Sequence, residues 1–296
     1  MTLGGDGPIE ALRVELGDRV RSLLAGRRVP AAQPYPAGDP GLFGPGSITW
    51  RVHGDLAMLI GGLRAVLAQT MHPLAMAGVA QHSNYRTDPW GRLHRTGHYI
   101  GVTTFGSTRQ ALDAVVAVRR IHERVRGVAP DGRPYSATDP HLLSWVHATE
   151  VHSFLVAYER YGQRPLGAAD ADRYVAEMAV LGAEIGVDEV PTSRAELREY
   201  FAAIRPELAA GDDAREAVRF LLWPPVAPVV RPAYTVICAA GLGLLPAWVR
   251  RDLKVPSLPL ADPLAVRPAA RLLLGALGWS LGPSPSVETA RTRAHA

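Results

Sequence analysis

Residues 107–127 read STRQALDAVVAVRRIHERVRG and place apolar side chains at the spacing of a helix. Ser107 and Thr108 are typical of a helix start, and Gly127 is typical of the position after a helix end. These signals predict a helix over 108–126. Its apolar stripe, which would face the core, consists of Leu112, Val115, Val118, Ile121 and Val125.

His122 lies on or beside this stripe and is therefore expected to point inward. Arg119 and Arg126 stand three residues before it and four after it, so a continuous helix would present all three on one side. Nearby arginine charge lowers the pKa of an imidazole and keeps it neutral, as iron ligation requires. On this helix alone, a core histidine bonded to a backbone carbonyl, with both arginines in solvent, is the simpler interpretation.

Helical patterns continue along most of the chain, with short breaks between them and no run of alternating strands. The sequence predicts an all-α, single multi-helix domain. Its expected helices cover 8–25, 48–70, 72–82, 90–103, 108–126, 139–162, 168–186, 192–208, 212–222, 228–243 and 262–277.

Three regions follow from the breaks in this pattern. Residues 1–47 are expected to hold the N-terminal helix and an arm whose segment 29–47 is rich in Pro and Gly. Residues 48–280 form the expected helical domain, and the polar residues 281–296 form an expected flexible tail.

Composition narrows the class of protein. Hydrophobic residues make up 47% and charged residues 20%, which excludes wholesale disorder. A net charge of +4 without a Lys/Arg block gives no support to nucleic-acid binding. Cys238 is the only cysteine, so an intrachain disulfide is excluded. The start of the chain lacks a signal-peptide core, and the longest apolar stretch, 233–248, is too short to span a bilayer. We therefore expect a cytoplasmic protein without a transmembrane segment, and a homodimer is compatible with the sequence.

A polar segment precedes the histidine helix. Residues 81–106 read QHSNYRTDPWGRLHRTGHYIGVTTFG and are too polar for simple core. Arg92 and Thr96 are four residues apart and would share a helix face, with Arg95 and Tyr99 adjoining. Such a face could donate hydrogen bonds to an oxygen species or a substrate carbonyl. A solvated surface helix would carry similar residues.

Further upstream, residues 54–83 read GDLAMLIGGLRAVLAQTMHPLAMAGVAQHS, a long apolar helix with a break near His72 and Pro73. The small residues Gly61, Gly62 and Ala65 would let another helix or a flat macrocycle approach closely. Tight helix packing explains them equally well.

Together, these segments resemble the catalytic domain shared by fungal MpaB oxygenases and bacterial rubber oxygenases, also called latex-clearing proteins. The resemblance covers about residues 48–255. It is carried by residues 54–83, by 86–106, by the RxxHxxxR pattern at 119–126, by YSATDPHLLSWVHATEVHSFLVAYERYG at 135–162 and by LGLLPAWVRRDL at 242–253.

This resemblance implies a b-type heme in a pocket between helices and oxidation of hydrophobic substrates. Position by position, His122 corresponds to the axial iron ligand, and Arg119 and Arg126 correspond to the arginines beside it, which suit heme propionates. Arg92 and Thr96 correspond to residues on the opposite, distal face. His147 is interpreted as a core or heme-pocket histidine of the family.

Two departures limit the implied chemistry. Arg95 stands where rubber oxygenases have a lysine that can approach the iron, and arginine is a poor metal ligand. The stretch 72–83 also lacks an Asp or Glu that could act as the carboxylate base of rubber oxygenases. Both departures argue against polyisoprene cleavage and favour a small, apolar substrate.

The leading hypothesis is therefore a heme-dependent oxygenase that activates O2 or peroxide at iron held by His122, with Arg92, Arg95 and Thr96 orienting the oxidant. One alternative is a non-catalytic heme carrier or gas sensor, which would use the same histidine. A second is a non-heme metal oxidase built on His147, Glu150 and His152. Their spacing departs from the Glu-x-x-His pairs of dimetal helical sites.

Overall fold

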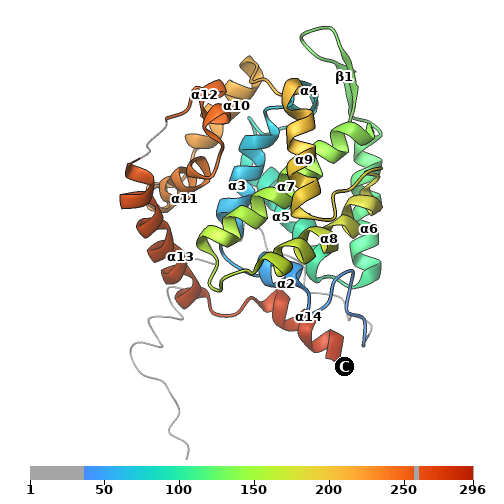
Figure 1. Cartoon of the computed structure of the whole chain (residues 1–296), viewed down its shortest axis with the longest axis vertical. Helices are drawn as coiled ribbons and strands as arrows, with labels where there is room; N and C mark the ends of the chain where they lie inside the picture. Colours follow the sequence, from blue (N-terminus) through green and yellow to red (C-terminus); the bar gives the residue numbers. More distant parts are fainter. Residues whose placement is uncertain (1–36, 257–259, 296) are drawn as a thin grey trace, which may run out of the picture.

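The computed structural model describes residues 37–256 and 260–295, and this part of the chain is a single, mostly helical domain (Figure 1). The expectation of an all-α fold is confirmed. The helices are α2 (Ile48–His53), α3 (Met58–Gln69), α4 (Pro73–His82), α5 (Pro89–Phe105), α6 (Thr108–His122), α7 (Pro140–Tyr161), α8 (Ala168–Ile185), α9 (Arg194–Ile204), α10 (Asp212–Leu222), α11 (Arg231–Gly243), α12 (Ala247–Asp252), α13 (Arg267–Leu281) and α14 (Pro285–His295).

Several helices begin where the sequence signals predict. Ser107 caps α6 in a capping box, in which its side chain accepts from the backbone N–H of Gln110 and the Gln110 side chain accepts in return. Asp88 and Asp139 cap α5 and α7, and each is followed by proline at the first helical position. Local capping chemistry therefore sets these boundaries.

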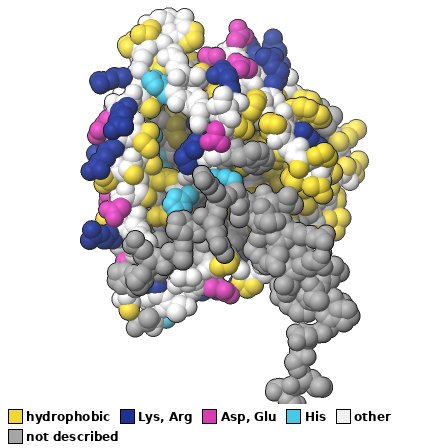
Figure 2. Space-filling view, turned by 180° about the vertical axis from the view of Figure 1, so that it is seen from behind, with side chains coloured by type: hydrophobic (Ala, Val, Ile, Leu, Met, Phe, Trp, Pro, Cys, Tyr) yellow, Lys and Arg dark blue, Asp and Glu magenta, His cyan; other side chains and the backbone are white. Residues whose placement is uncertain are grey.

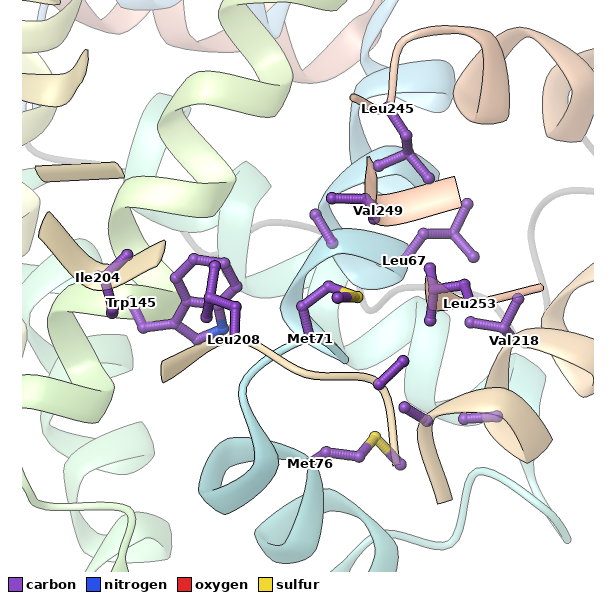
Figure 3. Close-up of a cluster of buried hydrophobic side chains, with 14 of the residues drawn as sticks. Leu67, Met71, Met76, Trp145, Ile204, Leu208, Val218, Leu245, Val249 and Leu253 are labelled. Carbon is purple, nitrogen blue, oxygen red and sulfur yellow. The ribbon is translucent and has the colours of Figure 1, made fainter. Parts of the chain in front are cut away.

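The central helix α7 runs beside α3 through the middle of the molecule (Figure 1). Side chains are buried around much of its circumference, including Trp145, Val151, Phe154 and Tyr158. A cluster of buried apolar side chains joins α3 and α7 to the later helices (Figure 3). It contains Leu67, Met71, Met76, Trp145, Ile204, Leu208, Val218, Leu245, Val249 and Leu253. Within the described ranges, no helix is both long and apolar enough to cross a bilayer.

Gly61 marks the closest approach of α3 to α7. A Cβ atom on Gly61 would lie 3.0 Å from Cδ1 of Phe154 and 3.2 Å from Cβ of Ala157. A Cβ atom on the neighbouring Gly62 would meet nothing within 4 Å. Helix packing thus accounts for Gly61, one of the small residues for which the sequence allows two interpretations.

Gly61→Val is expected to destabilise the protein, because the new side chain must displace Phe154 or separate the two helices. Overpacking of this kind costs about 1–3 kcal/mol. Gly62→Val is the matched control and should change the free energy of unfolding by less than about 0.5 kcal/mol. Urea midpoints measure both, and equal effects at the two positions would contradict the packing argument.

Helix α6 is shorter than the sequence predicts. It ends at His122, and the chain turns, with the N–H of Val125 bonded to the carbonyl of His122, into β1 (Arg126–Val128). This strand pairs antiparallel with β2 (Pro134–Ser136), in the register that sets Gly127 opposite Tyr135. Cross-strand pairing therefore replaces the last expected helical turn. Ile121, which the sequence predicts to lie in the apolar stripe, is 58% exposed.

Two further expectations need correction. The helix expected over 48–70 is broken at 54–57, where the Asp55 carboxylate accepts from the N–H groups of Ala57 and Gln163. The expected flexible tail instead contains α14, because the buried guanidinium of Arg293 donates to the carbonyls of Asp39 and Gly106. The expected helix over 8–25 lies outside the described residues.

Candidate functional site

The first half of α5 carries the three predicted distal residues. Arg92 is partly buried and donates to the hydroxyl of Ser83, and burial lowers the pKa of its guanidinium. Thr96 is exposed and donates back to the carbonyl of Arg92. Arg95 is turned toward the helix start, where it contacts Asp88 at 3.2 Å and Asn84 at 3.1 Å. Arg92 and Thr96 thus share one face, and Arg95 is tied to the N-cap.

His122 occupies the last turn of α6. Its imidazole is partly buried, burial lowers the pKa of the ring, and within the described part of the chain no group is hydrogen-bonded to it. A neutral imidazole without a hydrogen-bond partner can offer a nitrogen lone pair to a metal.

Only one of the two predicted flanking arginines shares a helix with His122. Arg119 is on α6 and approaches the carbonyl of Glu184 at 3.4 Å. Arg126 is on β1, four residues beyond the end of the helix, and is exposed. The expected alignment of Arg126 on the same helix face is therefore wrong, because the strand pairing described above ends α6 early.

Helices α5 and α6 form a pair that brings the predicted site residues to one end. Only Gly106 and Ser107 separate the two helices, which pack on each other as an antiparallel helical hairpin. The start of α5, with Arg92 and Thr96, therefore lies toward the same end as His122. The predicted site residues come from two helices of one hairpin.

Open space surrounds this half of α5. Residues 93–98 are exposed on every side of the helix, although α2 and α6 pack against α5. The face in Figure 2 is hollowed on the side where α6 lies, with hydrophobic side chains within the hollow and histidine side chains beside it. The exposed stretch of α5 and the hollow together make this region a candidate binding site.

His147, the remaining predicted cofactor residue, packs where α7 meets α8. A Cβ atom on Gly182 of α8 would lie 2.8 Å from Nε2 of His147, so the glycine makes room for the ring. Burial lowers the pKa of His147 to about 4. The ring is thus neutral and tightly packed, as expected of a core histidine.

Sequence reasoning missed a polar cluster centred on Glu150. Burial raises the pKa of this carboxyl to about 7, and burial, together with the nearby Glu150, raises the pKa values of Tyr99 on α5 and Tyr174 on α8. His53 of α2 completes the cluster, with its ring nitrogens 2.9 Å from the Tyr174 hydroxyl and 2.8 Å from that of Thr104. A glutamate on a helix whose side chains are mostly expected to be buried is the signal that could have indicated this cluster.

Glu150 extends the predicted distal face inward. Tyr99 lies one helical turn beyond Thr96 on α5, and its buried hydroxyl has no hydrogen-bond partner among the residues that the structure describes. Glu150 is partly exposed, although burial raises the pKa of its carboxyl to about 7. Groups with perturbed pKa values that line a recess are typical of functional sites.

His147, Glu150 and His152, the residues of the alternative non-heme metal site, point to different neighbours. His147 meets α8, Glu150 meets the two tyrosines, and Nδ1 of His152 lies 3.2 Å from the guanidinium of Arg64. Within the described ranges they do not form a group of metal ligands. This arrangement gives no support to a metal centre built on that trio.

The fold and the recess define an all-α domain with a polar interior site beside a helical hairpin. A family model described as "ER-bound oxygenase mpaB/B'/Rubber oxygenase, catalytic domain" matches residues 50–277. The chain belongs to this family of oxygenase catalytic domains.

Two curated relatives are uncharacterized proteins of Mycobacterium bovis and Mycobacterium tuberculosis. Each is 32% identical over 150 residues, which cover 48% of this chain. The match spans 58% of the length of either relative. No solved structure matches the chain.

Proposed function

We propose that this chain is a heme-dependent oxygenase in which His122 holds the iron and a small hydrophobic substrate enters the recess beside α5. The observation that carries the proposal is the partly buried, neutral and unbonded imidazole of His122, next to an open helix face in a chain of an oxygenase family. When bound, a heme would supply the activation of O2 or peroxide.

The residues around His122 fit such a group in charge. Arg126 is exposed, and its guanidinium has no ion pair or hydrogen bond within the described part of the chain, so it is free to meet a propionate. Among the described residues, Arg119 has only the long contact to the carbonyl of Glu184, and it could serve in the same way. Because α6 ends early, Arg126 would approach the propionate from β1 and not from the helix face that holds His122.

On the α5 side, Arg92 and Thr96 would orient the oxidant and the substrate. The Arg92 guanidinium stays charged and donates hydrogen bonds, and the Thr96 hydroxyl lies on the same face. We assign Arg95 a supporting role in addition, because its contacts with Asp88 and Asn84 fix the start of α5. Glu150, with a pKa raised to about 7, could hold a proton on a carboxyl oxygen deeper in the recess.

Absorption spectroscopy of the purified full-length chain after reconstitution with hemin tests the proposal. We expect a stoichiometric complex with a Soret band that shifts on reduction with dithionite and again on addition of carbon monoxide. Turnover of hydrophobic compounds under O2 or peroxide would then separate an oxygenase from a heme carrier or gas sensor. A chain that binds no heme, yet folds, would contradict the proposal.

A further inference from the structure

A second set of potential ligands lies outside the residues assigned to the heme. It consists of His72, which caps α4, His141, the second residue of α7, and Glu207, the last residue of the short helix η1 (Arg205–Glu207). One donor atom from each side chain lies within 4.8 Å of the others. Three segments that are far apart in the sequence therefore bring two imidazoles and a carboxylate to one point.

His72 is the least satisfied member of this group. Its side chain is 1% exposed, and within residues 37–256 and 260–295 neither ring nitrogen has a hydrogen-bond partner. Burial is the largest influence on the ring and lowers its pKa, so the imidazole is neutral with a free lone pair. A buried polar group without a partner is unfavourable, and the binding of an ion is a common reason why a native fold retains one.

The distances suit a tetrahedral metal ion. Donors bound at about 2.1 Å to a tetrahedral ion lie about 3.4 Å from one another. Nε2 of His72 is 3.6 Å from Oε2 of Glu207, close to that spacing. Nε2 of His141 is 2.8 Å from the same oxygen, which is a hydrogen-bond distance. A bound ion would replace this hydrogen bond. The His141 and Glu207 side chains are 48% and 43% exposed, so they have room to adjust and leave a path for an ion and a water ligand.

The neighbouring structure holds these ligands in place. The ring centroid of Trp145 lies 6.1 Å from that of His72, and the N–H of Ala209 donates to the carbonyl of Met71 at 2.9 Å. The loop after η1 is therefore already bound to the residue before His72. The Asp139 carboxylate accepts from the backbone N–H of His141 at the start of α7.

We propose that His72, His141 and Glu207 bind one divalent transition-metal ion of the zinc type, which fastens η1 to the starts of α4 and α7. Two imidazoles and a carboxylate are ligands that zinc prefers, and a water molecule would fill the fourth position. The proposal does not depend on the heme assignment, because it involves none of the same residues.

The site is tested by removing metal from the full-length chain and titrating it with Zn²⁺ while calorimetry measures the heat of binding. The visible absorption of a Co²⁺ complex reports the coordination geometry. We expect one equivalent of Zn²⁺ to bind and to raise the melting temperature, and Co²⁺ to give the visible bands of tetrahedral coordination. Glu207→Gln and His141→Asn should each weaken Zn²⁺ binding by about tenfold or more. Both positions are exposed, so circular dichroism without metal can establish that the variants remain folded.

His295→Asn is the matched control. This exposed histidine lies on α14, far from α4 and α9 in Figure 1, and its replacement should leave Zn²⁺ affinity unchanged. Absence of Zn²⁺ binding would overturn the proposal. So would equal affinity in the folded Glu207→Gln and His141→Asn variants, which would leave the hydrogen bond between His141 and Glu207 as the reason for their proximity.

Discussion

The His122→Ala variant should lose stoichiometric heme binding and with it the Soret band of the reconstituted chain. Removal of His122, the iron ligand that we propose, would leave a heme held only by its other contacts with the protein. Even changes around a metal ligand weaken metal binding by about 10- to 100-fold, so loss of the ligand itself should cost at least about 100-fold. Heme titration followed at the Soret band measures the change.

His147→Ala is the matched control, because His147 is the other histidine that the sequence associates with the cofactor. Its ring packs against Gly182 of α8, so we expect this variant to be less stable and to keep the wild-type Soret spectrum. Added imidazole should partly restore the spectrum of His122→Ala by filling the vacated ligand position. Wild-type heme affinity and spectrum in a folded His122→Ala variant would refute His122 as the axial ligand.

Local signals in the sequence predicted most helices closely. The expected helix over 212–222 coincides with α10, and those over 168–186 and 139–162 match α8 and α7 to within one residue at each end. Caps and helical periodicity depend on residues a few positions apart, which a sequence displays directly.

The end of α6 depended on pairing within a β-hairpin and on packing against α4, which helical spacing does not reveal. Residues 126–128 pair with 134–136, and Val125 packs with Tyr135 and Ala77 in a separate apolar cluster. This tertiary pairing outweighs the helical spacing of Ile121 and Val125. The same reason explains α14, whose Arg293 bonds to carbonyl groups more than 180 residues away in the sequence.

Some residues of the candidate site could be found from the sequence, and others only from the structure. The roles of His122, Arg92 and Thr96 came from short motifs and remain predictions, and the structure adds their placement on one helical hairpin. Glu150 and His72 stand out only when their neighbours are known: Tyr99 and Tyr174 for the first, and Glu207 for the second. The sequence around each residue does not show these partners, because they lie on other helices.

The Glu150→Gln variant should be more stable than the unchanged protein at about pH 8 and equally stable at about pH 4. Burial raises the pKa of Glu150 from 4.5 to about 7, so between these values the folded state holds a proton that the unfolded state has released. The free energy of unfolding therefore falls as pH rises through this window. The full effect would be about 3 kcal/mol, because a tenfold change in an ionisation constant is worth ~1.4 kcal/mol.

Since Glu150 keeps some exposed area, solvent screening reduces the expected difference to about 2 kcal/mol. Glutamine has the same shape as glutamate and never ionises. The free energy of unfolding in urea is therefore measured against pH for both proteins, and one profile is subtracted from the other. The contributions of the buried histidines cancel, because they are common to both proteins. Glu199→Gln, at an exposed position on α9, should show no such difference. If the Glu150→Gln difference were the same at both pH values, the carboxyl would ionise freely, and Glu150 could not store a proton in the recess near neutral pH.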